Sequence, residues 1–448
     1  MRFIDTRALV DDRPHEAVFR VHRDVFADAA LFELEMENVF GKTWVFLGTE
    51  SQVAKPNDFI SAWIGRTPIL VTRDKAGSLS AFLNICPHKG TQLAHAEQGN
   101  AKYHVCAYHG WAFDPAGRNI DIKDRAAACY PPVFEAQNHD LVPIARVASY
   151  GGLIFGSLSP DVPALDDYLG DVKAFIDMAM QQGPHGMEVV RGRVCYTYRG
   201  TWKLQMDNAM DQYHLTSVHA SYMSVMDKRR KGDGHTDAHQ FDWNKRVLQQ
   251  SGMFNFSHGH SVTWINQAEV EKRPIYPVMD EIRSRVGAVK ADWMLKAKIT
   301  LIFPNFQIAD GTTLNLRTFR PISVGLTEMR VHCIAPIGED PALRRWRLRQ
   351  FEDFFGASGF ASPDDAACFE AAQRGYAAMP YDWLQGYSRG ITRLKVGADE
   401  HAAQLGIRPV ASLAGDFDLN CETTLHSPYR EWVRLMGGGS SGEKGLKS

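Results

Sequence analysis

The sequence lacks the features that mark membrane proteins and nucleic-acid-binding proteins. No apolar run approaches the roughly 20 residues of a membrane-spanning helix, so no membrane partner is expected. Positive and negative charges are nearly balanced: the sequence has 50 Lys and Arg residues and 52 Asp and Glu residues, which gives a net charge of -2. This balance argues against nucleic acid or an anionic membrane surface as the main partner.

Cysteine is scarce, and its count does not suit a disulfide framework. Seven is an odd number, and residues 1–5 show no signal-peptide pattern. The chain is therefore expected in the cytoplasm. Two of the cysteines belong to motifs described below. The other five are expected to be buried, reduced thiols: Cys129, Cys195, Cys333, Cys368 and Cys421.

The length and composition are those of a globular protein with at least two domains: 448 residues, of which 44% are hydrophobic and 23% charged. Residues 1–42 are predicted to be helical, with Asp28 as a helix N-cap. Residues 43–160 are rich in predicted strands, whereas residues 161–436 alternate helices with long strands. The tail, residues 437–448, is expected to be flexible and without function. Within the third region the predicted elements are strands over residues 194–198 and 315–319 and a helix over residues 341–355.

Two short motifs each combine one cysteine with one histidine: Cys86-Pro87-His88 and Cys106-Ala107-Tyr108-His109. Two cysteines can hold one iron of a [2Fe–2S] cluster while two neutral histidines hold the other, which raises the reduction potential above that of an all-cysteine cluster. A structural zinc site is the alternative, but such sites usually begin with two closely spaced cysteines and end in paired histidines. The order Cys, His, Cys, His therefore favours an electron-transfer cluster.

Each motif falls in a loop beside predicted strands. Strands over residues 69–72 and 79–85 precede the first motif, while extended segments over residues 103–105 and 111–113 flank the second. Two loop tips, each with one sulfur and one ring nitrogen, could close over a cluster from opposite sides.

These motifs resemble those of the large (alpha) subunit of the Rieske non-haem iron aromatic ring-hydroxylating oxygenases. Residues 86–90, Cys-Pro-His-Lys-Gly, and residues 106–111, Cys-Ala-Tyr-His-Gly-Trp, carry the likeness. The family usually has Arg where Lys89 stands, and Lys keeps the charge but loses the planar fork. The resemblance extends from about Arg13 to Trp432. Three stretches resemble the benzoate, toluate and anthranilate dioxygenase branch: residues 15–21, 254–261 and 387–390.

The resemblance implies an α+β fold with two cofactors. Residues 43–160 would form a Rieske β domain, and residues 161–436 a helix-grip catalytic domain with an antiparallel sheet. Residues 1–42 would pack on the catalytic domain. The first implied cofactor is a [2Fe–2S] cluster and the second a mononuclear Fe(II). The implied cluster ligands are Cys86, His88, Cys106 and His109.

A second group of potential ligands lies in residues 207–219. His214 and His219 are five residues apart, roughly 140° on a regular helix, so both face one ion only if the helix ends, bends or bulges between them. A lone histidine pair is usually explained by ordinary packing, but here Asp207 and Asp211 accompany it and the cluster motifs precede it. The joint pattern favours an Fe(II) site of two histidines and one carboxylate, which leaves positions open for oxygen and substrate.

The carboxylate ligand comes from the resemblance, which places it far downstream after a Gly-rich turn. Residues 355–365 fit this description and end in Ser-Pro-Asp-Asp. The resemblance implies that Asp365 is the iron ligand, and Asp364 is the alternative. Taken by itself, Ser-Pro-Asp-Asp is an ordinary helix start, in which either aspartate would cap a helix beginning near Ala366.

Asp211 precedes His214 by three residues, close enough on a helix to hydrogen-bond its ring and fix its orientation. The resemblance implies a further, catalytic role, in which Asp211 bridges to the cluster ligand His109 of an adjacent copy of the chain. Such a bridge requires a ring-shaped homotrimer, or an α3β3 assembly with a small subunit. The spacing alone shows only an aspartate near a histidine.

The reaction is also implied by the resemblance. Electrons from NADH would arrive through a flavin- and iron-sulfur-containing reductase, directly or through a ferredoxin. The chain would use them and O2 to cis-dihydroxylate a single-ring aromatic carboxylate such as a benzoate or an anthranilate. Monooxygenation or demethylation of an aromatic compound on the same architecture is the alternative. A different class, a metal-stabilised electron-transfer or binding protein, also remains open.

A substrate carboxylate needs a cation or several hydrogen-bond donors. Arg317, on a predicted strand, is a candidate, and its alternative is a structural or solvated arginine. Five apolar residues could line the pocket, although core packing explains each equally well: Met206, Met210, Ile302, Phe303 and Phe360.

Overall fold

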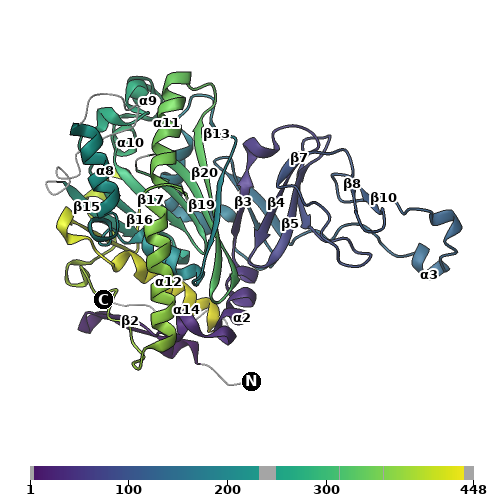
Figure 1. Cartoon of the computed structure of the whole chain (residues 1–448), viewed down its shortest axis with the longest axis horizontal. Coiled ribbons are helices and arrows are strands. Elements are labelled where there is room, and N and C mark those ends of the chain that lie inside the picture. Colours follow the sequence, from purple (N-terminus) through teal and green to yellow (C-terminus); the bar gives the residue numbers. More distant parts are fainter. Residues whose placement is uncertain (1–4, 232–248, 312, 357, 438–448) are drawn as a thin grey trace.

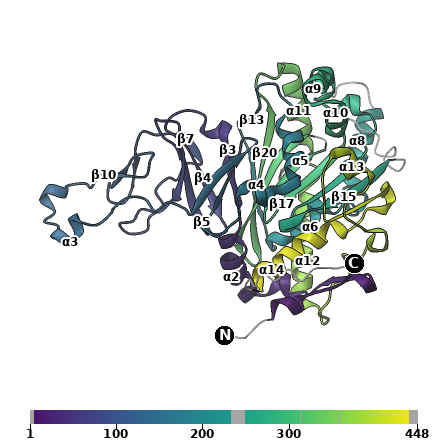
Figure 2. The same cartoon turned by 180° about the vertical axis from the view of Figure 1, so that it is seen from behind.

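The computed structural model describes residues 5–231, 249–311, 313–356 and 358–437. It consists of a large body, in which helices pack on a broad sheet, and a smaller lobe of short strands that projects from the body (Figure 1). The opposite view shows the same division (Figure 2). The predicted α+β fold class is thus confirmed. The predicted tail lies outside the described residues except for Gly437.

The first part of the chain departs from the prediction of helix. Strand β1 (Val10–Arg13) pairs with β2 (Val18–Val21) in an antiparallel hairpin. Along β2, half-buried and buried positions alternate, and Phe19 and Val21 are fully buried. Because alternation with a period of two is the signature of a strand, and valine favours strands, the helical prediction is wrong for these residues.

The first α-helices, α1 (Asp24–Ala27) and α2 (Ala29–Asn38), come after this hairpin, whereas Thr6–Leu9 and Pro14–Glu16 form only single 3-10 turns. The carboxylate of Asp28 accepts hydrogen bonds from the backbone N–H groups of Ala30 and Leu31, at 2.7 and 2.9 Å. Asp28 is therefore the predicted N-cap.

The N-terminal segment contacts the large body through Glu35, which is fully buried. Its carboxylate accepts hydrogen bonds from the indole N–H groups of Trp202 and Trp432, at 2.8 and 2.7 Å, and pairs with the ammonium of Lys203. A buried carboxylate is tolerated only when its oxygens are satisfied in this way.

The smaller lobe contains three antiparallel sheets and a short helix, α3, which lies at its far end (Figure 1). The predicted strands beside both Cys/His motifs are present. The bounds of the elements are β3 (Val45–Thr49), β4 (Asp58–Ile64), β5 (Thr67–Arg73), β6 (Leu79–Leu83), β7 (Gln98–Asn100), β8 (His104–Val105), β9 (Ala112–Phe113), β10 (Asn119–Asp121), α3 (Pro132–Glu135), β11 (Arg146–Tyr150) and β12 (Leu153–Ser157).

A single antiparallel sheet runs through the large body in the order β13-β20-β19-β18-β17-β16-β15-β22-β21, with β14 also paired to β20. The predicted strand 194–198 is β14, and 315–319 lies within β19. The strand bounds are β13 (Met187–Val189), β14 (Val194–Tyr198), β15 (Gln250–Asn255), β16 (Ser261–Ile265), β17 (Ala297–Ile302), β18 (Phe306–Asp310), β19 (Leu314–Ser323), β20 (Leu326–Pro336), β21 (Lys395–Val396) and β22 (Ala411–Asp416).

Helices cover both faces of this sheet. Helices α11 and α12 lie in front of it in Figure 1, and α4 and α5 in front of it in Figure 2. The predicted helix 341–355 is α11. Within the described residues, no helix is both long and apolar enough to cross a membrane. The bounds are α4 (Leu165–Leu169), α5 (Lys173–Met180), α6 (Trp202–Met210), α7 (Leu215–Val218), α8 (Ala220–Lys231), α9 (Met279–Val286), α10 (Ala288–Met294), α11 (Pro341–Phe354), α12 (Ser362–Ala378), α13 (Glu400–Leu405) and α14 (His426–Met436).

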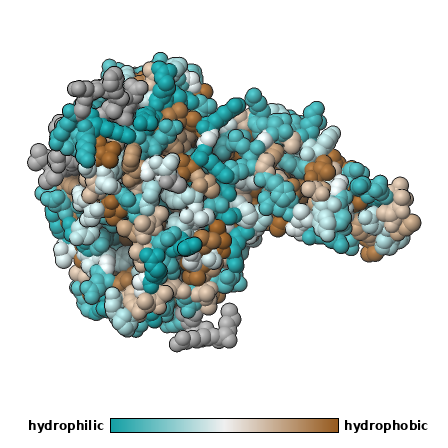
Figure 3. Space-filling view, in the orientation of Figure 1, coloured by the Kyte–Doolittle hydropathy of each residue, from teal (hydrophilic) through white to brown (hydrophobic). Residues whose placement is uncertain are grey.

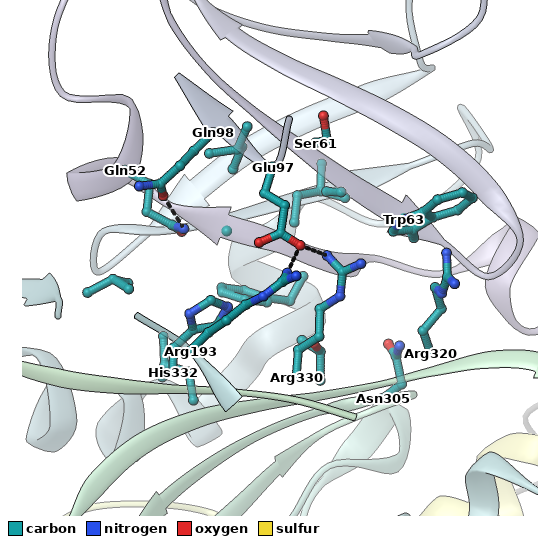
Figure 4. A pocket seen from close by; sticks show the side chains of 18 residues that line it. Gln52, Ser61, Trp63, Glu97, Gln98, Arg193, Asn305, Arg320, Arg330 and His332 are labelled. Carbon is teal, nitrogen blue, oxygen red and sulfur yellow. Dashed lines mark hydrogen bonds and ion pairs between the residues drawn. The ribbon is translucent and has the colours of Figure 1, made fainter. Parts of the chain in front are cut away.

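An arginine-lined cavity separates the smaller lobe from the sheet (Figure 4). Glu97, just before β7, forms ion pairs with Arg193 and Arg330 of the body. The guanidinium of Arg320 lies 4.0 Å from the ring centroid of Trp63, a cation–π contact across the same boundary. These contacts fix the position of the lobe against β19 and β20.

All seven cysteines are free. Cys333 and Cys421 are buried, as predicted, but Cys129, Cys195 and Cys368 are exposed, so the prediction of burial is wrong for these three. Cys195 illustrates the reason, because inward and outward positions alternate along β14 and this residue falls on an outward one.

Candidate metal centres and active-site pocket

The two Cys/His motifs form two loops with the same backbone geometry. The N–H of Cys86 donates to the carbonyl of Thr91, and that of Gly90 to the carbonyl of Cys86, at 2.8 and 2.9 Å. The second loop repeats both bonds: Cys106 N–H donates to the Trp111 carbonyl and Gly110 N–H to the Cys106 carbonyl, at 2.8 and 2.9 Å. In each loop the glycine has a positive φ, 77° for Gly90 and 74° for Gly110, which a residue with a Cβ rarely adopts.

The loops bring the four predicted ligands together. Cys86 and Cys106 are buried, whereas His88 and His109 are half-buried and their ring centroids lie 4.4 Å apart. The ring of His88 stacks on Trp111, with centroids 4.9 Å apart.

The donor atoms fit a cluster with mixed ligands. The Nδ1 atoms of His88 and His109 are buried and have no hydrogen-bond partner in the described chain. Burial raises the pKa of the Cys86 thiol, and the neighbouring Cys106 adds to this effect, so two thiolates side by side need a compensating cation. Burial, followed by His109, lowers the pKa of His88 and favours the neutral imidazole that a metal binds.

The helix break predicted between His214 and His219 is present. Helix α6 ends at Met210; His214 then directly precedes α7 and His219 directly follows it. The one-turn helix α7 therefore carries a candidate ligand at each end, and both rings face the same point.

Asp365 completes a cluster of three candidate ligands. One ligand atom from each of His214, His219 and Asp365 lies within 4.8 Å of the others. Oδ1 of Asp365 is 3.3 Å from Nε2 of His219 and 3.7 Å from Nε2 of His214. Burial raises the pKa of Asp365 despite these two histidines, a cost that a bound cation would remove. The donor set thus fits the predicted iron site.

Asp364 does not join this cluster, because its carboxylate accepts a hydrogen bond of 2.9 Å from Ser221. Helix α12 begins at Ser362, earlier than the predicted start near Ala366, and neither aspartate caps it. Both aspartates lie in its first turn, where a carboxylate interacts favourably with the helix dipole.

Two further polar residues surround the histidines. Oδ2 of Asp211 lies 3.5 Å from Nδ1 of His214, so the two are close as the spacing predicted, but they form an ion-pair contact and not the predicted hydrogen bond. The amide nitrogen of Asn208 donates to Oδ1 of Asp365 at 3.1 Å and lies 3.2 Å from Nε2 of His214. Sequence reasoning missed Asn208, because its only signal was its place inside the 207–219 motif.

A cavity of about 120 Å³ adjoins the three candidate ligands. Its walls come from α6, α7, the strands β16 to β19 and the end of α11. The residues that line it, besides the candidate ligands and the two polar residues just described, are Ala209, Gln212, Leu215, Thr263, Ile265, Ala297, Lys298, Ile299, Ala309, Gly311, Arg317, Phe354 and Phe355.

The five apolar residues considered for this pocket do not line it. Met206, Met210, Ile302 and Phe303 are buried in the hydrophobic cores, and Phe360 is 41% exposed. Core packing was the open alternative for all five, and it holds for the first four.

Arg317, in contrast, lines the pocket. Its Nε donates to Oδ1 of Asn315 at 3.0 Å, and its guanidinium lies 4.5 Å from the ring centroid of Phe355. Among the described residues no carboxylate forms an ion pair with it, and burial lowers its pKa to about 10. Lys298, the other cation of the pocket, donates instead to the carbonyls of Trp293 and Lys296 and to Asp310, at 2.9, 2.7 and 3.1 Å.

Comparison with known proteins accounts for both groups of ligands. The family model of the Rieske [2Fe-2S] domain matches residues 43–135, and that of the ring hydroxylating alpha subunit (catalytic domain) matches residues 187–404. The chain belongs to the ring-hydroxylating alpha-subunit family. This alpha subunit is an oxygenase that uses a [2Fe–2S] cluster and a mononuclear non-haem iron. A zinc-stabilised binding protein is therefore excluded.

Relatives of this alpha subunit match it over most of its length. The toluate 1,2-dioxygenase subunit alpha of Pseudomonas putida is 38% identical over 92% of this chain and 89% of its own. The 2-halobenzoate 1,2-dioxygenase large subunit of Burkholderia cepacia is 39% identical over 94% and 91%. The naphthalene 1,2-dioxygenase of a Rhodococcus species, 24% identical, shares the fold with a TM-score of 0.78 over 94% of this chain and 95% of that one.

Proposed function

We propose that the chain is the catalytic subunit of a terminal oxygenase that cis-dihydroxylates a single-ring aromatic carboxylate, such as a benzoate or an anthranilate. The observation that carries this proposal is Arg317, a half-buried arginine without an ion-pair partner among the described residues, in the cavity beside the candidate iron ligands. The relatives include enzymes named for toluate, 2-halobenzoate and anthranilate, each a ring with a carboxylate.

The proposed iron ligands are His214, His219 and Asp365, and the proposed cluster ligands are the two Cys/His pairs. When bound, the cluster supplies electrons one at a time and the iron supplies the site at which dioxygen is reduced. The chain's own contribution is to hold the ring beside this site and to exclude water. Asn208 and Asp211 orient the histidine and the carboxylate that they contact.

Arg317 is proposed to bind the substrate carboxylate. A partly desolvated cation with no ion-pair partner is costly, and a carboxylate can satisfy a guanidinium with two parallel hydrogen bonds. The contacts with Asn315 and Phe355 hold the guanidinium in one place, so little side-chain entropy is lost on binding. The aromatic ring would then lie against apolar residues such as Ile265 and Ile299.

The electron supply and the assembly follow from the same proposal. Relatives carry the names subunit alpha or large subunit, so the enzyme has more than one component. We propose an NADH-dependent flavin and iron-sulfur reductase, with or without a ferredoxin, and a cytoplasmic location, where NADH is found. Hydrophobic surface is visible on the projecting lobe (Figure 3). Its exposed large side chains suit a protein partner: Tyr103, Val105, Tyr108, Ile120, Val133 and Val142.

We further propose a homotrimer, or α3β3 with a small subunit, in which Asp211 meets His109 of an adjacent copy. The side chain of Asp211 is 23% exposed and His109 is half-buried at a loop tip, so each remains accessible to a second chain. An aspartate between two metal-bound histidines would join the cluster of one copy to the iron of the next.

Product analysis with the reconstituted holoenzyme tests the function. Benzoate and toluate should each yield a cis-diol carrying two labelled atoms from ¹⁸O₂, whereas toluene and benzamide, which lack the carboxylate, should react poorly. A single labelled atom in the product would instead indicate a monooxygenase. Equal turnover of toluene and toluate would contradict a site for carboxylates.

A further inference from the structure

Asp207 is a half-buried aspartate one helical turn before Asp211, and the proposed chemistry leaves it without a role. Its Oδ1 accepts a hydrogen bond from the phenol of Tyr429, and its Oδ2 one from the phenol of Tyr387, both at 2.8 Å. Tyr429 lies on α14 and Tyr387 in the loop after α12, so this one side chain joins α6 to two distant segments.

The turn of α6 that these bonds hold is the one beside the candidate iron ligands. Asn208, the next residue, contacts both Asp365 and His214, and Asp211 follows the last residue of the helix. The carbonyl of Met210 accepts a further hydrogen bond of 2.8 Å from Thr424. Asp207 itself lines neither the pocket nor the metal site, so it can act there only through its neighbours.

The surroundings of Asp207 make its charge sensitive to pH. Burial raises its pKa to about 7, although both phenols and Lys203 lower it. Asp211 raises it further, and Lys203 is already paired with Glu35. The other titratable groups that face it are the phenols of Tyr198 and Tyr376.

Protonation would break this arrangement. An ionised carboxylate accepts from both phenols at once, whereas a carboxylic acid has one O–H donor in place of an acceptor. One of the two phenols would then have to rotate and accept a hydrogen bond from the O–H of the carboxylic acid. Otherwise that buried phenol would lose its hydrogen-bond partner. A change in these bonds would shift the end of the helix, which carries Asn208 and leads directly into Asp211.

We propose that Asp207 is a positioning residue whose ionised form, held by Tyr387 and Tyr429, fixes the last turn of α6 in the geometry that oxygenation requires. The inference rests on the proposed roles of Asn208 and Asp211. Turnover therefore falls as the pH drops and Asp207 takes up a proton.

The test measures single turnovers of the pre-reduced holoenzyme from mildly acidic to mildly alkaline pH, with benzoate as substrate. The parent enzyme should lose activity on the acid side with a midpoint near neutrality. Tyr387→Phe and Tyr429→Phe each remove a donor to the carboxylate and so raise its pKa. The midpoints of their rate–pH curves should therefore move up by about one pH unit. At a given acid pH their single-turnover rate should be about tenfold below that of the parent, while the rate at alkaline pH is preserved.

Two variants sharpen the result. Tyr198→Phe is the matched control, because its buried phenol donates to the carbonyl of Thr201 at 3.1 Å and not to Asp207, so the midpoint should not move. Asp207→Asn cannot titrate, so its acid-side loss should vanish. A uniform loss of rate with an unchanged midpoint in the Tyr387 and Tyr429 variants would show a merely structural role and overturn the proposal.

Infrared titration of the same proteins gives a readout that does not depend on turnover. The carbonyl band of a protonated, buried carboxylic acid should appear as the pH falls through the midpoint, and it should be absent from Asp207→Asn. If the enzyme oxidises no aromatic carboxylate, the proposed function fails while this band still decides the state of Asp207. A spectrum in which Asp207→Asn removes no such band would overturn the inference.

Discussion

The amide nitrogen of Asn208 donates a hydrogen bond of 3.1 Å to Oδ1 of Asp365, the carboxylate that completes the candidate iron site. The same nitrogen lies 3.2 Å from Nε2 of His214. One side chain on α6 therefore contacts two of the three candidate ligands, and these come from segments far apart in the sequence. This contact holds Asp365 in place before any metal binds.

Substitution of Asn208 should weaken iron binding. Asn208→Leu keeps the approximate volume but removes the donor, and the loss of such an outer contact typically costs about 10- to 100-fold in metal affinity. Competition with an Fe(II) chelator measures this, with the cluster absorbance as internal standard. Gln205→Met is the control, because Gln205 lies on the same helix and bonds to Gln307, away from the iron site. Equal affinity in the Asn208 variant and the parent would reduce Asn208 to a packing role.

Arg317→Gln should impair the use of aromatic carboxylates. Removal of one partner of a buried charge pair costs about 2 kcal/mol or more, equivalent to about 30-fold in kcat/KM. The kcat/KM of Arg317→Lys should lie between that of the parent enzyme and that of Arg317→Gln, because lysine keeps the charge but loses the planar fork. Arg320→Gln is the matched control, since Arg320 lies on the same strand but faces the cavity beneath the smaller lobe (Figure 4). Steady-state kinetics with benzoate measure kcat/KM for each variant. An equal loss in Arg317→Gln and Arg320→Gln would count against carboxylate binding by Arg317.

Asp211→Asn should keep both metal centres and slow product formation by about 10- to 100-fold, because the amide cannot hold the charge that orients His214. Iron analysis measures the mononuclear iron, visible absorbance measures the cluster, and a single-turnover assay measures the rate of product formation. His214→Ala provides the contrast: it should retain the colour of the cluster and lose the mononuclear iron and all turnover. Fast product formation in Asp211→Asn would rule out the proposed bridge between copies.

The buried ion pair between Glu35 and Lys203 should stabilise the attachment of the N-terminal segment. Glu35→Gln removes the carboxylate that forms the ion pair with buried Lys203, which costs about 3–5 kcal/mol of unfolding free energy. The control is Glu33→Gln, because the pair of Glu33 with Arg66 is about half exposed, with side-chain exposures of 56% and 48%. That variant should lose less than about 1 kcal/mol. Urea unfolding measures the free energy of unfolding of both variants. Similar losses in the two would contradict the expectation that the buried ion pair contributes more than the exposed one.

The sequence by itself determined the chemistry. Cys86, His88, Cys106 and His109 could be proposed as cluster ligands because each Cys/His pair lies within a few residues of one short loop, and such local spacing is kept on folding. The N-cap at Asp28 and the strand 194–198 were predictable for the same reason, since each depends on neighbouring residues.

Only the tertiary structure decided what depends on contacts between distant segments. Asp364 and Asp365 are adjacent and chemically identical, and the turn of α12 alone directs one to the histidines and the other to Ser221. The partners of Asn208 and the facing of Arg317 into the pocket likewise follow from how α6 and β19 pack. Which face of an element becomes buried is fixed by the elements that pack against it, and no local pattern in the sequence records them.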